Sequence, residues 1–272
     1  MIELRPDNYE RIRPLLLGMD FHLVGRSILA LKTPSRIFVD DPQEPHVLFA
    51  EVGHRYILAG DVSHEEFNHS VQRRFTDVIL PDAQAEGLDG FALYYDSSAW
   101  EEKIDFLIQG KEIIHADREY YACKKLKHAP QDHFPDGFQL KLVNADLIAV
   151  PHLKHLDTLK EEMTSERPSA EDFLAKSFGV CAIQENELAG WCLSEYNVEG
   201  RCEIGIETIS EYRQRGIATG LTLAFLEHAF ANGITEVGWH CFKRNLPSAR
   251  TALKAGFEKI CDYKSFIVLL KE

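Results

Sequence analysis

Hydrophobic and polar positions follow a regular pattern in the second half of the chain. Period-two alternation, or short apolar runs between turn residues, predicts strands over 138–143, 180–184, 188–196, 202–209, 237–241 and 265–270. Helical spacing covers about 145–162, 216–232 and 246–255, and Ser169 with Asp172 predicts the start of a further short helix. The order is strand, helices, three antiparallel strands, helix, strand, helix, strand, which is typical of a mixed α/β fold.

The first half of the chain carries the same two signals less regularly. Strands are predicted over 36–40, 46–52, 55–60, 91–95 and 119–123, and a helix over 8–18. Ser63 with Glu66 has the spacing of a capping box before a helix that ends near residue 80, and Ser98 with Glu101 opens another. This half is therefore also predicted to be α/β.

A linker is predicted between the two halves. Residues 127–137 include Pro130, Pro135 and Gly137 among polar neighbours, a composition typical of a connection between domains. We therefore expect an N-terminal α/β domain over residues 1–130 and a second domain, with a mixed α+β sheet, over residues 137–272. A length of 272 residues suits two modest domains.

Composition and charge narrow the classes of function. Hydrophobic residues make up 45% and charged residues 27% of the chain, as in ordinary globular proteins. The net charge of −13 argues against nucleic acid as a partner, because neutralising phosphates requires a basic face. The acidity is compatible with a cationic, amine-bearing substrate, and it is explained equally well by solubility alone.

Targeting and metal signals are not evident in the sequence. The six cysteines have neither CxxC spacing nor the spacing of a zinc site; they are Cys123, Cys181, Cys192, Cys202, Cys241 and Cys261. The first residues lack a basic segment followed by an apolar one, and no apolar run approaches the length of a membrane span. We therefore expect a cytoplasmic protein with neither a metal nor a membrane partner.

A turn after the strand 202–209 has the features of an anion site. Residues 213–218 read Arg-Gln-Arg-Gly-Ile-Ala, and the predicted long helix begins at Gly216. A helix start offers unpaired N–H groups and a partial positive charge, and glycine lets a phosphate approach the backbone. Ala218 keeps the next position small, Thr219 adds a hydroxyl, and Arg213 and Arg215 add charge. An ordinary loop-to-helix junction would look similar, so the position of the turn after an antiparallel strand matters.

With a second motif downstream, the C-terminal half resembles the GNAT superfamily of acetyl-CoA-dependent N-acetyltransferases. The family pattern [Q/R]-x-x-G-x-[G/A] is met by Arg213, Gly216 and Ala218. The family's second element, an asparagine followed by a small residue and then Gly-Phe, is met by Asn245, Ser248, Gly256 and Phe257. Residues 203–208, 212–219 and 239–241, with 65–68 and 90–94, look more closely like the zwittermicin A resistance-type subgroup.

The resemblance implies a coenzyme A site between two central strands that splay apart. Pantetheine would lie along the main chain of Thr208 and Ile209, beside Asn245, with Ser248 near the thiol or the phosphate arm. The backbone amides expected to hold the pyrophosphate belong to Gln214, Arg215, Gly216, Ile217, Ala218 and Thr219, next to the side chain of Arg213. Acetyl-CoA is accordingly expected as the acyl donor.

Two glutamates are candidates for the base that deprotonates the amine. Glu203 and Glu207 lie four residues apart on one predicted strand, so they face the same side of the sheet. We expect Glu207 to be the base or the amine anchor, because it lies nearer the splay, and Glu203 to be the second candidate. Both could also be plain solvent-facing positions. His240 on the next strand is interpreted as structural, with an acceptor-site base as the alternative.

The acid that protonates the leaving thiolate is less defined. Many members of the family carry a tyrosine seven residues after the motif asparagine, and that position is Ala252 here. Ser248, Tyr196 or water could replace it, or the thiolate could leave without a proton. This departure leaves catalysis less secure than binding of the cofactor.

We therefore interpret the chain as an N-acetyltransferase that acetylates a primary amine of a small molecule, as a monomer or homodimer. A protein or peptide acetyltransferase, and a GNAT module that senses acetyl-CoA or a ligand without turnover, remain alternatives. The N-terminal half is compatible with a degenerate GNAT-like unit that lost its cofactor turn, or with an unrelated lid. The acceptor itself is expected to contact variable loops, which the sequence does not identify.

Overall fold

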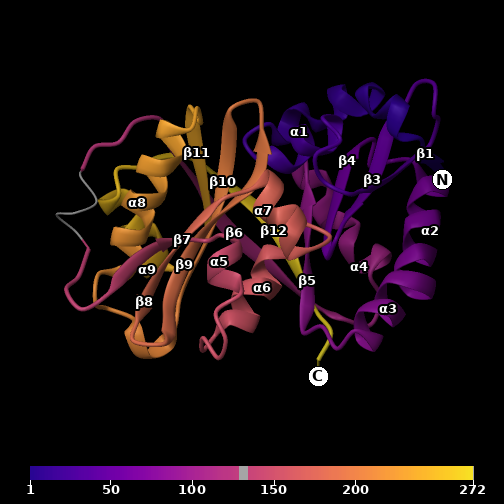
Figure 1. The fold of residues 1–272 in the computed structure, drawn as a ribbon. Coiled ribbons are helices and arrows are strands. Elements are labelled where there is room, and N and C mark those ends of the chain that lie inside the picture. Colours follow the sequence, from indigo (N-terminus) through magenta and orange to yellow (C-terminus); the bar gives the residue numbers. More distant parts are fainter. Residues whose placement is uncertain (129–133, 272) are drawn as a thin grey trace. The chain divides into compact units, whose positions relative to one another are not determined.

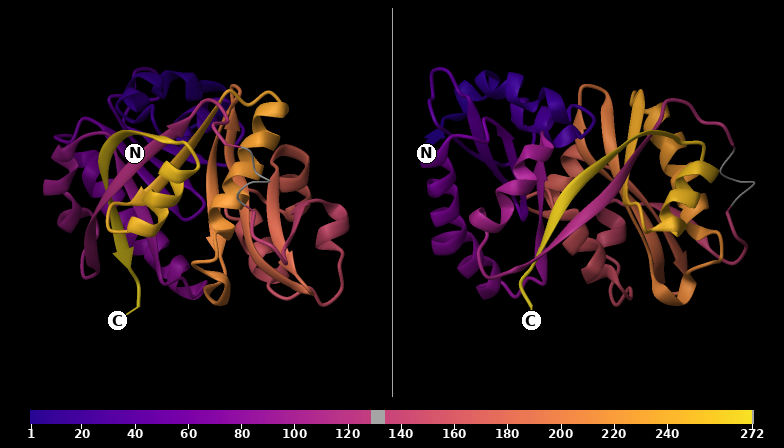
Figure 2. Two further views of the ribbon diagram at one scale, coloured as in Figure 1. Left: turned by 90° about the vertical axis from the view of Figure 1, so that its left-hand side faces the viewer. Right: turned by 180° about the vertical axis from the view of Figure 1, so that it is seen from behind.

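The computed structural model describes residues 1–128 and 134–271 (Figure 1). The chain forms two compact units: unit 1 comprises Met1–Asp117 and Tyr263–Glu272, and unit 2 comprises Arg118–Asp262. The predicted linker at 127–137 lies partly outside the described residues. The units divide instead inside two long strands, β6 (Glu112–Cys123) and β12 (Glu258–Leu269), which are visible in Figure 2.

Unit 2 is built on a mixed sheet. In sheet order its strands are residues 118–123 of β6, β11 (Glu236–Phe242), β10 (Arg201–Thr208), β9 (Glu187–Val198), β8 (Gly179–Gln184) and β7 (Gln139–Leu142). Neighbouring strands run antiparallel except β10 and β11, which are parallel. This confirms the predicted mixed α/β class and the predicted succession of strands and helices from residue 138 to residue 255. The last strand predicted for the second domain, 265–270, pairs instead with β5 (Gly90–Tyr95) and belongs to unit 1.

Helices cover both faces of the unit 2 sheet (Figure 1). The long α8 (Ile217–Ala231) and α9 (Leu246–Lys254) pack on one face, where Val180, Ala182 and Cys202 contribute to a shared apolar core. The short α5 (Ala145–Ile148), α6 (Leu156–Met163) and α7 (Ala170–Lys176) pack on the opposite face, with Cys181 and Trp191. Because alternate strand residues point to opposite faces, we refer below to the α8 face and the α6 face.

Unit 1 repeats this order of strands. Its sheet contains β1 (Ile2–Leu4), β2 (Arg36–Val39), β3 (Val47–Val52), β4 (Arg55–Gly60), β5 (Gly90–Tyr95) and residues 265–269 of β12. Only β4 and β5 are parallel, like β10 and β11 in unit 2. Each unit therefore has a meander of four antiparallel strands, a parallel fifth strand and a sixth segment taken from the other half of the sequence.

The helices of unit 1 connect the same pairs of strands. A 3₁₀ segment, Pro6–Met19, and α1 (Leu23–Leu29) join β1 to β2. Between β4 and β5 lie α2 (Glu65–Arg74), a π segment Phe75–Ile79 and α3 (Leu80–Ala85). A 3₁₀ turn, Ser98–Glu102, and α4 (Ile104–Leu107) follow β5.

Several local predictions differ from the structure for identifiable reasons. The helix expected over 145–162 is divided into α5 and α6, because Pro151 and two left-handed residues, His152 and His155, intervene. The capping box of Ser63 was wrong: the Nδ1 atom of His64 accepts the N–H of Phe67 at 3.2 Å. The cap of α7 by Ser169 is confirmed, with Asp172 N–H donating to its hydroxyl at 3.2 Å.

Candidate functional site

The two parallel strands of unit 2 separate partway along their length. β10 and β11 pair only at Arg201↔Glu236, Cys202↔Val237 and Glu203↔Gly238. β10 nevertheless continues to pair with β9 as far as Thr208, and β11 continues to pair with β6 as far as Phe242. A gap between β10 and β11 therefore opens immediately beyond Glu203 and Gly238, and we call it the splay.

Backbone polar groups of β10 face the splay. The N–H of Ile209 donates to the carbonyl of Ala189 on the β9 side at 3.0 Å. Backbone groups alternate in direction along an antiparallel strand, so those of Ile206 and Thr208 point toward β11. The side chain of Arg213 occupies part of this edge, because its Nε donates to the Thr208 carbonyl at 2.9 Å. Of the two residues expected to contact pantetheine, Thr208 faces the splay and Ile209 has its N–H bound to β9.

The turn expected to bind pyrophosphate links β10 to α8. Gln214 and Gly216 both have left-handed backbones, with φ of 63° and 87°. The first hydrogen bond within the helix is from Gly220 N–H to Gly216 carbonyl, at 3.1 Å. The amides of Ile217, Ala218 and Thr219 therefore precede the helical ladder and point out of the helix start. A turn with alternating backbone hand at such a helix start forms a concave anion site.

Side chains add charge and shape at the edge of this turn. Arg215 lies over the ring of Tyr212, with its Cζ atom 5.4 Å from the ring centre. The Tyr212 hydroxyl donates to Glu187 at 2.8 Å and holds that ring against the end of β9. Both arginines are exposed, but Arg213 is hydrogen-bonded to β10 and to Glu207, whereas Arg215 is held by the ring of Tyr212.

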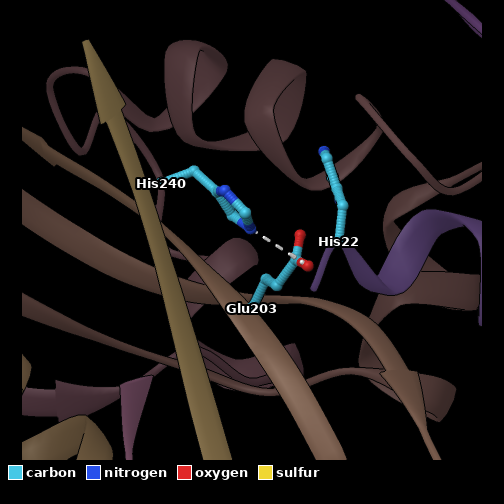
Figure 3. A group of neighbouring side chains, drawn as sticks. All are labelled: His22, Glu203 and His240. Atoms are coloured by element: carbon cyan, nitrogen blue, oxygen red, sulfur yellow. Dashed lines mark ion pairs between the residues drawn. The ribbon is translucent and has the colours of Figure 1, made fainter. Parts of the chain in front are cut away.

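The two candidate bases differ sharply in environment. Glu207 accepts a hydrogen bond from Arg213 at 3.0 Å, and its side chain is 44% exposed. Glu203 is only 2% exposed, and its Oε1 lies 3.2 Å from Nε2 of His240, whose side chain is 9% exposed. Figure 3 shows these two side chains pointing toward each other from β10 and β11. The structure therefore brings Glu203 and His240 together where the splay begins, and leaves Glu207 at the surface.

A glycine and a tyrosine complete the surroundings of this pair. The ring of Tyr120, from β6, stacks on His240 with centres 4.6 Å apart and an interplanar angle of 24°. A Cβ atom at Gly238 would lie 3.0 Å from Tyr120 Cε2 and 3.1 Å from Glu203 Cγ. Gly238 thus leaves the space in which Glu203 and Tyr120 approach each other. Burial, then Glu236 and Glu203, raise the pKa of Tyr120 above the usual value for a phenol.

The alternating directions of side chains along β10 and β11 place Glu203 and His240 on the α6 face. Cys202 and Ile204 belong to the core beneath α8, so Glu203 points the other way. Trp239 and Cys241 likewise belong to the α8 face, which places His240 opposite them. The turn at Gly216 leads into α8, whereas the Glu203–His240 pair faces the α6 side, so a donor and an acceptor could approach the splay from different faces.

The second motif forms the start of α9. The side chain of Asn245 accepts the N–H of Ser248 at 3.2 Å and caps this helix. The hydroxyl of Ser248 accepts the indole N–H of Trp239 at 3.0 Å. Trp239 is the first residue of β11 beyond its last pair with β10. Ser248 therefore ties α9 to β11 at the splay.

Two positions considered for the acid are buried in the protein. Ala252 is fully buried in the core between α8 and α9. Tyr196 is 1% exposed and lies at a bulge of β9, with a left-handed φ of 48°. Its backbone N–H donates to Glu166 at 3.0 Å.

Sequence reasoning did not identify Tyr120 and Gly238 as site residues. Tyr120 lies in the first half of the chain, and the pairing of β6 with β11 brings it to His240. The glycine in the run Val237-Gly238-Trp239-His240 was the available signal, since glycine inside a strand often marks a close approach.

In unit 1, the parallel strands β4 and β5 correspond to β10 and β11, but their ends do not separate. β4 and β5 pair as far as Leu58↔Tyr95, and the next amide, Asp96 N–H, donates to the Leu58 carbonyl at 3.2 Å. The Asp96 carboxylate then accepts the N–H of Gly60 at 3.1 Å, and burial raises the pKa of this carboxyl. Asp61 follows Gly60, and Glu65 and Glu66 are the first two residues of α2. Unit 1 thus joins the ends of β4 and β5 where unit 2 opens a splay.

The lengths and compositions of the helices bear on whether the chain could cross a membrane. Within residues 1–128 and 134–271, no helix is long and apolar enough to cross a membrane.

Comparison with known proteins agrees with this geometry. The sequence model of a family described as GNAT acetyltransferase matches residues 15–266. The chain is 26% identical over 243 residues to YdfB of Bacillus subtilis (strain 168), an uncharacterized N-acetyltransferase, with 87% of each chain covered. It resembles the crystal structure of a GCN5-related N-acetyltransferase-like protein from Streptococcus suis 89/1591, with 19% identity, a TM-score of 0.73, and 96% and 98% of the two chains covered. A tandem GNAT protein from the clavulanic acid biosynthesis pathway shares the fold at 11% identity, with a TM-score of 0.57 over 100% and 98% of the chains.

Proposed function

The chain belongs to the GNAT acetyltransferase family, and on that premise we propose that unit 2 transfers an acetyl group from acetyl-CoA to a primary amine of a small molecule. The observation that carries this proposal is the splay beyond Glu203 and Gly238, which lies beside a helix start built to bind an anion. An extended pantetheine arm can pair with the open edge of a strand, as an added strand would.

The residues present fit acetyl-CoA, which would supply the thioester. The amides of residues 214–219 would hold the pyrophosphate at the start of α8, with Arg215 beside it. The main chain of Thr208 would hold the pantetheine arm. Asn245 and Ser248 would border that arm from α9, where their own hydrogen bonds fix their positions. Arg213 would act mainly by orienting the turn through Thr208 and Glu207.

We assign the base to the pair Glu203–His240 rather than to Glu207. The amine arrives as an ammonium and must lose a proton before its nitrogen can attack. The pair would take that proton directly or through water, since it is buried at the splay and already associated. Glu207 is supported less well, because it is exposed and bound to Arg213.

The reaction balances with these groups. The amine nitrogen forms a bond to the acetyl carbon, the carbon–sulfur bond breaks, and the electron pair leaves on sulfur. The products are the amide, the thiol of coenzyme A and one proton released to solvent. A Thr208 backbone N–H facing the splay would stabilise the negative charge on the carbonyl oxygen. Ser248 remains our candidate for returning a proton to the thiolate, because Ala252 has no hydroxyl to offer.

We propose further that unit 1 is a GNAT-like unit without a cofactor site. Its strand order repeats that of unit 2, its parallel strands stay joined, and its turn is acidic. An existing tandem GNAT protein with this overall fold supports such a duplication. A small-molecule acceptor is supported by the sequence resemblance to the zwittermicin A resistance-type subgroup, whereas a peptide acceptor and a sensing role without turnover are the alternatives.

An assay of thiol release from acetyl-CoA over a panel of primary amines tests the proposal. We expect amine-dependent release of thiol and a matching acetylated product. Binding of acetyl-CoA with no release for any amine or peptide would favour the sensing role. Release only with peptides would favour the peptide acceptor, and failure to bind acetyl-CoA would refute the assigned cofactor site.

A further inference from the structure

His240 lies at a point where β11 has lost one of its two neighbouring strands. β11 has β6 and β10 beside it in the sheet, and its last pair with β10 is Glu203↔Gly238. His240 comes two residues later, so β10 no longer pairs with the strand there. The contact between its Nε2 and Glu203, at 3.2 Å, fixes one corner of the imidazole. The last torsion of a histidine side chain has a broad minimum, so this contact alone does not fix the plane of the ring.

Tyr120 supplies the neighbour of His240 on the other side. In the antiparallel pairing of β6 and β11, Tyr120 is directly opposite His240. The side chains of such a pair lie on the same face, with Cβ atoms about 5 Å apart. The two rings stack, with centres 4.6 Å apart and an interplanar angle of 24°. An offset stack of two flat rings is favourable, and it fixes the plane that the Glu203 contact leaves open.

The ring of Tyr120 is itself held in place by the backbone of β11. A Cβ atom at Gly238 would lie 3.0 Å from Cε2 and 3.3 Å from the hydroxyl oxygen of Tyr120. The edge of the ring therefore passes close over Gly238, where any larger residue would displace it. Tyr120 is also buried, and close packing leaves a buried ring few other orientations. The stack on His240 thus has a rigid support.

The charged groups around the Tyr120 hydroxyl keep it neutral. Arg201 and Glu236 form an ion pair at the first rung between β10 and β11. Burial, then the negative charges of Glu236 and Glu203, raise the pKa of Tyr120, and the neighbouring Arg201 acts in the opposite direction. The net effect is a raised pKa, so the phenol carries no charge at pH 7. Tyr120 therefore adds an oriented ring beside the base without adding a charge that would compete with Glu203.

We propose that Tyr120 is a positioning residue of the acetyl transfer, whose ring holds the imidazole of His240 in the orientation that places Nε2 beside Glu203. This role rests on the proposed function and adds to the base a third residue, contributed by β6. Tyr120 acts through His240 and not on the amine or on acetyl-CoA. Its loss should therefore slow the chemical step and leave binding of acetyl-CoA unchanged.

Three substitutions on β6 test this role: Tyr120→Leu, Tyr120→Phe and Tyr121→Leu. Tyr120→Leu removes the stacked ring, so kcat at saturating amine should fall about tenfold or more, with KM for acetyl-CoA within about threefold of the native value. Tyr120→Phe keeps the ring and should restore most of the lost kcat. Tyr121 is the matched control, because it is equally buried and belongs to the core on the α8 face. Tyr121→Leu should change kcat by no more than about threefold, since it leaves the stack intact.

Native kcat in Tyr120→Leu would overturn this role, and so would an equal loss in Tyr121→Leu, because the effect would then belong to the core in general. If Tyr120→Leu does not fold, Tyr120→Met replaces it with an unbranched side chain that also lacks a ring, and the same results are expected.

If no amine releases thiol, nitrogen NMR signals of the His240 ring in the free protein separate the two proposals. Glu203→Gln gives the reference for a ring that has lost its carboxylate. A change in the same direction in Tyr120→Leu, with none in Tyr121→Leu, would support the positioning role while the transferase proposal fails. Native ring signals in Tyr120→Leu would overturn the positioning role in that case as well.

Discussion

The Oε1 atom of Glu203 lies 3.2 Å from Nε2 of His240, and this pair is buried where β10 and β11 part. A carboxylate beside an imidazole keeps the ring oriented and favours its charged form when it takes a proton. In the proposed function this contact is the base, because it lies where the pairing of β10 and β11 ends. Glu207, on the same face of β10, has no comparable partner in the core, because its hydrogen bond is to exposed Arg213.

The first prediction concerns these two glutamates. Glu203→Gln should lower kcat about 100-fold or more, the usual contribution of a general base, with little change in KM for acetyl-CoA. Glu207→Gln is the matched control on the same strand and should change kcat by no more than about threefold, as expected for a surface ion pair. Steady-state rates at saturating amine decide between them. A larger loss in Glu207→Gln than in Glu203→Gln would return the role of base to Glu207.

The second prediction concerns the space above Gly238. Gly238→Ala would place a methyl group 3.0–3.1 Å from Tyr120 and Glu203, so one of the two must move. Since orientation at a reacting centre is costly to disturb, we expect kcat to fall about tenfold or more. In Gly25→Ala, within α1, the new atom would meet Leu16 at 3.4 Å, an ordinary contact, and kcat should not change. Unaltered kcat in Gly238→Ala would show that the close approach of Tyr120 and Glu203 is not needed for transfer.

The third prediction separates backbone strain from binding at the two ends of α8. Gly216 and Gly233 have nearly the same left-handed φ, 87° and 86°, and a Cβ atom at either would meet nothing within 4 Å. Alanine at either position should therefore lower the free energy of unfolding by about 1–2 kcal/mol. Only Gly216→Ala should also weaken binding of coenzyme A in calorimetry, because its strain acts on the amides at the helix start. Equal weakening in Gly233→Ala would argue against a pyrophosphate site at this turn.

Part of the candidate site could be predicted from the sequence, and part could not. The turn at Gly216 was predictable, because a helix start after a strand and a glycine with positive φ are local features. The choice between Glu203 and Glu207 was not, since a period of two places both on one face. The position of the splay depends on the register of β11, which pairs with residues 118–123 of β6 more than a hundred residues earlier in the chain.

The boundary between the two units could not be predicted from the sequence either. Most helix and strand segments followed from periodicity, and the cap that was predicted correctly, Ser169 of α7, rests on residues three positions apart. The exchange of segments by β6 and β12 has no local signal, because each continues as a plain strand through the point where the units divide. A search for proline and glycine therefore placed the boundary in a nearby loop.

The fourth prediction concerns the pH dependence of stability. Hydrogen bonds from Lys259, at 2.7 Å, and from Tyr121, at 2.6 Å, lower the pKa of Glu119. A carboxyl with a lowered pKa in the folded state stabilises the protein above its unfolded pKa, and that contribution is lost as pH falls through the folded pKa. Glu119→Gln should therefore cost about 1 kcal/mol at pH 7, and its difference from the native protein should shrink below about pH 4. Urea unfolding at several pH values measures this difference.

The control for this measurement is Glu227→Gln, at an exposed position of α8. Its unfolding free energy should stay within about 0.5 kcal/mol of the native protein at every pH, as is usual for surface substitutions. A deficit in Glu119→Gln that stays constant, or grows, as the pH falls below about 4 would contradict the assigned role of the Glu119 carboxylate.

The last prediction is that one chain binds one molecule of acetyl-CoA. Unit 1 has the strand order of unit 2, so its topology alone would allow a second site. The ends of β4 and β5 are joined there by Asp96, which receives the amide of Gly60. The acidic residues Asp61, Glu65 and Glu66 at the start of α2 would repel a pyrophosphate. Titration calorimetry should give a stoichiometry of one, and Gly216→Ala should weaken that single event. A stoichiometry of two, with one event unaffected by Gly216→Ala, would place a second site in unit 1 and contradict its assignment as a unit without cofactor.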